Sequence, residues 1–293
     1  MSKVRKIKLT LKARPTIEGA GVRLKRVFGN EEVPLLDPFL LLDHFGSKNP
    51  EDYVAGFPWH PHRGIETITY MLNGKINHGD SLGNKGVINS GDVQWMTAGS
   101  GIIHSEMPQE TEGMMMGFQL WANLPASEKM MDPRYRDVLK TQIPTVELNE
   151  GVKVRIICGK LNGVEGPVND IMTDPEYIDV IMSPNSQFEH VVKEGYTVFA
   201  YLYNGKGFFD ENRDPLKHAE ELVIYDDGDE IVITSIDGDL RFLLVSGKPL
   251  NEPVAWYGPI VMNTQDEIRK AFEEYRNGTF IKHKPQMEED ITN

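Results

Sequence analysis

The chain has 293 residues, of which 40% are hydrophobic and 26% charged, and its formal net charge is −13. This composition is that of an ordinary globular protein, and the acidic balance argues against direct nucleic acid binding, which depends on Lys and Arg. The longest apolar runs are far shorter than the ~20 residues of a membrane helix, so no membrane association is expected. A single cysteine, Cys158, excludes an internal disulfide and indicates a cytoplasmic protein, with this thiol buried and inert.

The first half of the chain shows the alternation of β-strands. Residues 3–14 are basic and alternate their apolar positions, which predicts a first strand with a solvated basic face rather than a signal peptide. "ETITYMLNGKINHGD", residues 66–80, predicts a strand, an Asn73-Gly74 turn and a second strand in a β-hairpin. Prolines and charges then interrupt the alternation over residues 123–151, where we expect a linker.

Two short words occur twice in the same order. "YMLNGK" at 70–75 matches "YLYNGK" at 201–206, and "SGD" at 90–92 matches "DGD" at 227–229. Such words are common in turns, so chance is the alternative to duplication. Their shared order in two strand-rich halves favours two similar β-sandwich or barrel domains of jelly-roll type.

The chain ends with a helical pattern. Thr264 and Glu267 form a capping box, and Gly278 supplies a stop. One apolar stripe, expected to pack on a barrel, consists of Ile268, Ala271, Phe272 and Tyr275. We therefore predict an all-β protein with a short C-terminal helix, divided into domains 1–135 and 136–293.

Histidines occur in two tight words, "HPH" at 60–62 and "HSE" at 104–106. Residues i and i+2 of a strand point to the same face, so His60 lies beside His62, and His104 beside Glu106. Two such strands facing each other across a small barrel would surround one point with three nitrogens and one oxygen. This set suits divalent iron, copper, manganese, nickel or zinc, whereas a polar turn is the alternative for each word alone.

The repeat provides an internal control. The "NGK" anchor places Val191 and Lys193 opposite the first histidine pair, and the "GD" anchor places Arg241 and Leu243 opposite His104 and its carboxylate partner. None of these four makes a good ligand set. The sequence therefore predicts metal chemistry in the first domain only.

The other histidines suggest simpler roles. His44 is expected to be structural, and four more are expected to be solvated: His78, His190, His218 and His283. Glu66 follows His62 by four residues, so it is either a further ligand or a residue that orients a ligating imidazole.

Longer motifs carry a resemblance to a known family. "HPHRG" followed by "QWMTAGSGIIHSEMP" resembles the two cupin motifs of pirins, as do "LDPFLLLDHF", "QLWANLP" and "GPIVMNTQDEI". The resemblance spans nearly the whole chain and implies a bicupin, that is, two jelly-roll β-barrels (double-stranded β-helices) of which only the first binds metal. It implies Fe²⁺, with Cu, Mn, Ni, Co or Zn as alternatives, and it puts the ligands on His60, His62, His104 and Glu106 rather than on Glu66.

Two activities are implied by the resemblance. One is that of a quercetin 2,3-dioxygenase, which opens a flavonol or similar small aromatic substrate with O₂ and releases CO. Glu106 would then also be the general base, and the substrate would contact Phe57, Trp95 and Met96, each of which could instead be core. The alternative is a redox-sensitive regulator with a protein partner, nuclear in a eukaryote; a scaffold merely stabilised by metal is a third reading. We expect a monomer.

Overall fold

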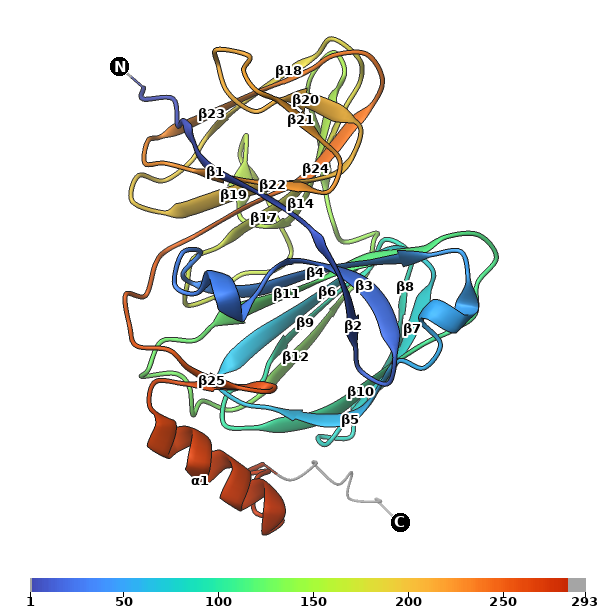
Figure 1. The fold of residues 1–293 in the computed structure, drawn as a ribbon, viewed down its shortest axis with the longest axis vertical. Helices are drawn as coiled ribbons and strands as arrows, with labels where there is room; N and C mark the ends of the chain where they lie inside the picture. Colours follow the sequence, from blue (N-terminus) through green and yellow to red (C-terminus); the bar gives the residue numbers. More distant parts are fainter. Residues whose placement is uncertain (1, 284–293) are drawn as a thin grey trace, which may run out of the picture. The chain divides into compact units, whose positions relative to one another are not determined.

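The computed structural model describes residues 2–283 (Figure 1). Within that range the chain forms many strands and one α-helix, which confirms the predicted all-β class. None of its helices there is long and apolar enough to cross a bilayer. Contacts divide the described chain into unit 1 (residues 2–15, 25–43 and 138–251) and unit 2 (residues 16–24, 44–137 and 252–283).

Unit 1 is built from a large and a small sheet. The large sheet contains β1 (Ile7–Lys12), β13 (Thr145–Asn149), β14 (Val152–Cys158), β17 (Glu176–Met182), β19 (Thr197–Asn204), β22 (Glu221–Tyr225) and β24 (Leu240–Gly247). The small sheet contains β18 (Gln187–Val191), β20 (Lys206–Phe208), β21 (Leu216–His218) and β23 (Glu230–Ser235). Their orders are β1-β22-β19-β24-β17-β14-β13 and β18-β23-β20-β21. A short ribbon, β15 (Lys160–Leu161) and β16 (Val164–Glu165), follows β14.

Unit 2 has the same two layers. Its large sheet contains β2 (Arg14–Glu18), β3 (Val22–Phe28), β4 (Phe39–Ser47), β6 (Ile65–Asn73), β9 (Val93–Thr97), β11 (Met115–Asn123) and β12 (Arg134–Val138). Parts of four of these strands are counted with unit 1, namely residues 14–15, 25–28, 39–43 and 138. Its small sheet contains β5 (Phe57–His62), β7 (Lys75–Asp80), β8 (Lys85–Asn89) and β10 (Ile102–Pro108). The orders are β12-β9-β6-β11-β4-β3-β2 and β5-β10-β7-β8. The ribbon β25 (Ala255–Tyr257) and β26 (Ile260–Met262) precedes the helix α1 (Gln265–Arg276).

The duplication is visible in the strand plan. Of the six strands β6 to β11, the first, fourth and sixth belong to the large sheet and the other three to the small sheet. The strands β19 to β24 follow the same order. The predicted hairpin at Asn73-Gly74 is wrong, because β6 and β7 lie in different sheets and the turn is a barrel corner. Gly74 has φ +101°, and Gly205 at the equivalent corner has φ +83°, a region that glycine adopts freely.

The strand plan also corrects the second anchor of the repeat. "SGD" (90–92) joins β8 to β9, whereas "DGD" (227–229) joins β22 to β23, one strand later in the plan. The counterpart of β10 is therefore β23, and the residues matched earlier, Arg241 and Leu243, lie on β24 instead.

The N-terminal strand is confirmed, but its basic residues are not all solvated. β1 pairs with β22 in antiparallel register. Arg5 is only 2% exposed, and its guanidinium donates to the carbonyls of Gly228 (3.0 Å), Tyr196 (2.8 Å) and Lys193 (2.8 Å). Burial of this charge is compensated by hydrogen bonds to the loops it joins.

The compact units differ from the predicted continuous domains 1–135 and 136–293 at both ends. The first strand belongs to unit 1 through its pairing with β22, and the C-terminal ribbon and helix belong to unit 2. The expected linker over 123–151 contains the strands β12 and β13. The helix itself is confirmed, with Thr264 as N-cap of a capping box and two buried residues, Ile268 and Ala271, in its stripe.

The turn after β5 is tightly held. Gly64 has φ +78°, donates to the carbonyl of Gly99, and approaches the carbonyl of Val261 so closely that a Cβ would lie 2.0 Å from that oxygen. Lys129 is 1% exposed, and its Nζ donates to the Gly64 carbonyl (2.9 Å), Asn123 Oδ1 (2.6 Å) and the Val261 carbonyl (3.1 Å). The turn is therefore joined to both β11 and β26.

Substituting Gly64→Ala should lower the free energy of unfolding by about 2–4 kcal/mol, from backbone strain plus the clash with Val261. Gly113→Ala is the matched control, since Gly113 has φ +90° with open space around it, and should cost about 1–2 kcal/mol. Urea unfolding monitored by Trp fluorescence measures both. Equal losses would contradict the close approach.

A second prediction concerns pH. Burial lowers the pKa of Lys129 from its ordinary 10.5 to about 7. Between these values the unfolded chain binds more protons than the folded one, so this lysine makes stability rise with pH over that window. Lys129→Met should flatten the rise by up to about 1.4 kcal/mol per pH unit, measured by urea unfolding from pH 7 to 10. Parallel curves for the two proteins would exclude a neutral Lys129.

Candidate metal centre

Three histidines meet where β5 and β10 pair. His104 stands opposite His60, and Ile102 opposite His62, so both words place their imidazoles on one face of the small sheet. Ring centroids lie 4.4 Å (His60–His104), 4.8 Å (His60–His62) and 5.0 Å (His62–His104) apart. The proline between the histidines is tolerated because β5 is an edge strand, where a missing N–H costs no ladder bond.

The ring nitrogens are arranged as metal ligands. Nε2 of His60 lies 3.0 Å from Nε2 of His62 and 2.9 Å from Nε2 of His104. Nδ1 of His60 lies 2.8 Å from the Pro58 carbonyl. Nδ1 of His62 lies 2.9 Å from the Pro259 carbonyl. A carbonyl only accepts, so both Nδ1 atoms carry the proton and both Nε2 atoms present lone pairs.

Those spacings fit a bound cation. Ligand nitrogens ~2.1 Å from a metal and ~90–110° apart lie about 3.0–3.4 Å from one another. Two lone pairs 3.0 Å apart repel unless a cation or a proton lies between them. Among the described residues, His60, His62 and His104 are the group whose ligand atoms all lie within 4.8 Å of one another.

Burial favours the ligating form of these rings. His62 is 1% exposed and His104 fully buried. Burial, followed by the neighbouring imidazoles, holds the pKa of each well below the ordinary 6.5. Both are therefore neutral near pH 7, and a neutral imidazole is the form that binds metal.

Glu106 lies on the same strand as His104 but outside the histidine group. The pairing of β10 with β5 shifts register between His104 and Glu106. The Oε1 atom of Glu106 accepts a hydrogen bond from the hydroxyl of Thr69 on β6 (2.8 Å). The same hydroxyl lies 2.5 Å from Oε1 of Gln119 on β11. The carboxyl group is thus held between the two sheets of unit 2.

The register of the large sheet shows which residues face the histidines. Thr69 points to Glu106, so the residues that share its face by strand alternation also face inward. They are Thr67 on β6, Gln94 and Met96 on β9, and Gln119 and Trp121 on β11. The ring of Trp121 lies 5.1 Å from that of His62.

Of the three expected substrate contacts, two lie on the histidine side. Met96 is on the inner face, and the ring of Phe57 lies 6.4 Å from that of His60. Trp95 is on the opposite face of the sheet and 2% exposed, so it is core.

Glu66 shares the outer face with Trp95. Its Oε1 accepts a hydrogen bond from Thr97 (2.6 Å), and burial raises its pKa. Neither of the two roles considered for Glu66 fits this position, which agrees with the ligand set that leaves Glu66 out. The reason is strand parity: β6 leaves Glu66 pointing away from the side on which Thr69 reaches Glu106.

Two histidines expected to be solvated are buried. His78, on β7 opposite Glu106, is 4% exposed, and its ring lies 5.5 Å from that of His104. Within residues 2–283 neither of its ring nitrogens has a partner at normal hydrogen-bond distance, but Nε2 lies 3.9 Å from Oδ2 of the buried Asp80, within ion-pair reach. His190, in unit 1, is 7% exposed and pairs with Glu176 (2.8 Å). Both histidines have polar neighbours in sequence, so nothing in the sequence indicates that they are buried.

The equivalent interior of unit 1 holds no such cluster among the described residues. The counterparts of β5 and β10 are β18 and β23, whose buried side chains include Phe188, Ile231 and Ile233. The strands equivalent to β5 and β10 thus carry apolar side chains, and these are not the residues matched from the sequence.

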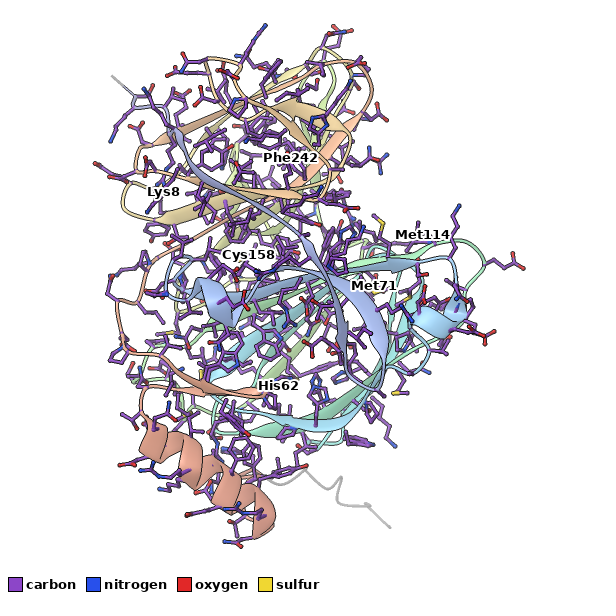
Figure 2. All side chains as sticks on the ribbon, in the orientation of Figure 1. Lys8, His62, Met71, Met114, Cys158 and Phe242 are labelled. Atoms are coloured by element: carbon purple, nitrogen blue, oxygen red, sulfur yellow. The ribbon has the colours of Figure 1, made fainter. Side chains whose placement is uncertain are left out.

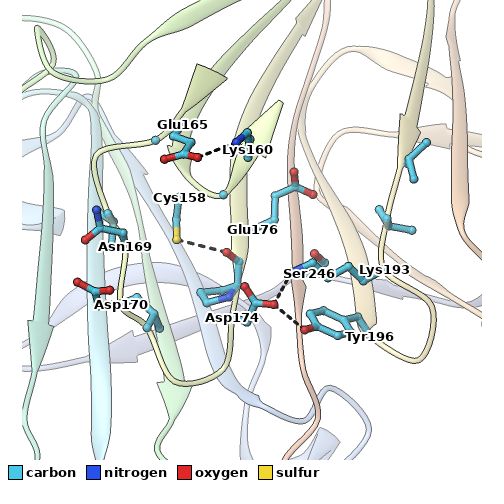
Figure 3. Close-up of a pocket in the computed structure, with 17 residues that line it drawn as sticks. Cys158, Lys160, Glu165, Asn169, Asp170, Asp174, Glu176, Lys193, Tyr196 and Ser246 are labelled. Carbon is cyan, nitrogen blue, oxygen red and sulfur yellow. Dashed lines mark hydrogen bonds and ion pairs between the residues drawn. The ribbon is translucent and has the colours of Figure 1, made fainter. Parts of the chain in front are cut away.

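Unit 1 contains a cavity of about 450 Å³ of a different kind (Figure 3). Several of its charges are paired: Lys160 with Glu165 (2.8 Å), and Asp174 with Lys193 and with the Tyr196 hydroxyl. The thiol of Cys158, predicted to be buried, donates to the Pro175 carbonyl (3.3 Å). A cavity in which Lys160, Asp174 and Lys193 already have charged partners is a weaker candidate than the three histidines.

Comparisons with known proteins agree with this geometry. The Pirin family model matches residues 21–122, and the Pirin C-terminal cupin domain model matches residues 177–281. A Pseudomonas aeruginosa protein named "Putative quercetin 2,3-dioxygenase" is 44% identical over 90% of this chain and 94% of its own length. A pirin-like protein of Caulobacter vibrioides is 42% identical over 94% of this chain and 99% of its own length.

A solved structure extends the likeness to three dimensions. The crystal structure of a quercetin 2,3-dioxygenase from Acinetobacter baumannii matches with a TM-score of 0.88 and 32% identity, covering 95% of this chain and 99% of that one. Two matching jelly-roll units, the family models and these relatives lead to one conclusion. The chain is a bicupin and belongs to the pirin family.

Proposed function

We propose that this protein is a metal-dependent quercetin 2,3-dioxygenase, which opens flavonols with O₂ and releases CO. The observation that carries the proposal is the convergence of three Nε2 atoms from His60, His62 and His104 in one cluster, in which His62 and His104 are buried. The names of the Pseudomonas and Acinetobacter relatives support the same activity. We further propose Fe²⁺ as the metal and a monomeric, cytoplasmic protein.

Glu106 completes the set in this proposal. It would join the three histidines in holding the metal, and its carboxylate would serve as the general base for the flavonol 3-hydroxyl. Its hydrogen bond from Thr69 holds the carboxyl in place for either task. When bound, the metal supplies a Lewis acid that lowers the pKa of the 3-hydroxyl and a centre at which O₂ can react.

The remaining inner face recognises a flat aromatic molecule. Phe57, Met96 and Trp121 supply apolar surface near the histidines. His78 is buried beside them with its Nε2 3.9 Å from Asp80, and its Nδ1 has no hydrogen-bond partner in the described chain, so this atom is placed to hydrogen-bond a substrate group. Trp95 has no part in this contact.

The metal set predicts a clear binding experiment. The double variant His60→Ala/His104→Ala should lose stoichiometric metal, because one remaining imidazole cannot hold the ion, and its melting temperature should no longer respond to chelator. Elemental analysis of protein purified without added metal measures the first, and thermal unfolding with and without EDTA the second. His218→Ala, at an exposed position of unit 1, is the control and should bind as wild type. Full metal content in the double variant would refute the site.

The activity predicts a turnover experiment. Iron-loaded protein under air should consume quercetin and release CO, and chelated protein should not. Glu106→Gln should lower kcat by about 10²-fold or more, the usual contribution of a general base. Gas-phase CO detection and loss of quercetin absorbance measure both. No ring cleavage by fully loaded protein would instead favour a redox-sensitive regulator that uses the same centre.

A further inference from the structure

We propose that the C-terminal segment from Ala255 to Phe280, here called the C-terminal clamp, positions His62 for metal binding. The inference rests on the proposed metal centre and goes beyond it by giving a role to residues about 200 positions away in sequence. β25, β26 and α1 belong to unit 2, and Figure 1 shows α1 beside β25.

The clamp selects the tautomer of His62, the residue labelled in Figure 2. The carbonyl of Pro259, at the tip of the β25–β26 ribbon, accepts the hydrogen bond from Nδ1 (2.9 Å). His62 is 1% exposed, so almost no water reaches the ring to accept the Nδ1 hydrogen bond instead of the Pro259 carbonyl. Without Pro259 the proton could move to Nε2, where it would block a metal. Partners of this kind are a general means of orienting ligating histidines.

The clamp also limits rotation of the ring. Trp121 meets His62 edge to face, with centroids 5.1 Å apart and planes at 85°. On the clamp, Trp256 packs on Trp121 with centroids 5.8 Å apart, and its indole N–H donates to the Gly258 carbonyl (2.8 Å). The ribbon therefore contacts His62 directly through Pro259 and indirectly through Trp121.

Main-chain contacts hold the ribbon against the strand that carries the histidines. Val261 N donates to the carbonyl of Arg63 (3.1 Å), the residue after His62. Nζ of Lys129 joins the carbonyls of Gly64 and Val261. The distance between the ribbon and the end of β5 is thus fixed at successive residues.

The end of α1 secures the other side of Arg63. Arg63 is 2% exposed, and its guanidinium forms an ion pair with Glu274 (2.8 Å). It also donates to the carbonyls of Phe280 (3.0 Å) and Ser100 (2.7 Å) and lies 4.3 Å over the Phe280 ring. Removing the carboxylate would leave a buried cation short of its counter-charge, which is costly. We expect the strand next to His62 to shift in response.

The decisive experiment compares neighbouring glutamates of one helix. Glu274→Gln removes the partner of Arg63, whereas Glu273→Gln makes the same charge change at an exposed position. Cobalt(II) affinity, measured by chelator competition, should weaken about 10-fold in Glu274→Gln and in Trp256→Ala, and should be unchanged in Glu273→Gln. The visible spectrum of bound cobalt(II) should shift in the first two only. Wild-type affinity in both clamp variants would overturn the proposal.

A second measurement does not depend on any variant folding or on metal. Long-range ¹H–¹⁵N spectra of the metal-free wild-type protein should show His62 protonated on Nδ1. Protonation on Nε2 would overturn the clamp even if the protein binds metal and cleaves quercetin. Conversely, loss of quercetinase activity with the expected tautomer and affinity shifts would contradict the proposed function and leave the clamp supported.

Discussion

The centre depends on the register between β5 and β10. Because strand side chains alternate, a slip of one residue would turn His60 and His62 to the other face of the small sheet and separate them from His104. The turn that follows β5 prevents such a slip, since Gly64 is packed against Val261 too closely for any side chain. The chemistry of the site is therefore specified by the backbone around the histidines as much as by the histidines themselves.

Sequence patterns correctly predicted the features that depend only on neighbouring residues, such as strand alternation and helix capping. The "HPH" and "HSE" words follow the two-residue period of a strand, and the capping box marks the start of α1. The corners at Asn73-Gly74 and Asn204-Gly205 show the limit of this reasoning. An Asn-Gly pair specifies a tight turn with positive φ, but it does not say which sheet the next strand joins. The hairpin prediction failed there, and the alignment of the second anchor failed at "SGD" (90–92) and "DGD" (227–229), which join different pairs of strands.

Side-chain direction was hardest to predict where a sheet is buried on both faces. All five residues of β9, "VQWMT", are buried, so polarity gives no signal for inside and outside. Trp95 and Met96 are both apolar neighbours of the "TAG" turn, yet they point to opposite faces. Trp121 and His78 were missed for a different reason, because their positions follow from register with distant strands and not from any neighbouring motif.

The difference between the two units explains why only unit 2 requires a clamp. Unit 1 fills its interior with packed side chains such as Phe188, Phe209 and Phe242, whose rings meet edge to face and need no partners. Unit 2 buries polar rings instead, and buried polar groups lose free energy unless each is held in a hydrogen bond. The Pro259 carbonyl supplies that bond for His62, and Arg63 ties the supporting segment to β5. A duplicated fold can thus acquire a polar interior in one copy when a segment outside the repeat compensates for its burial.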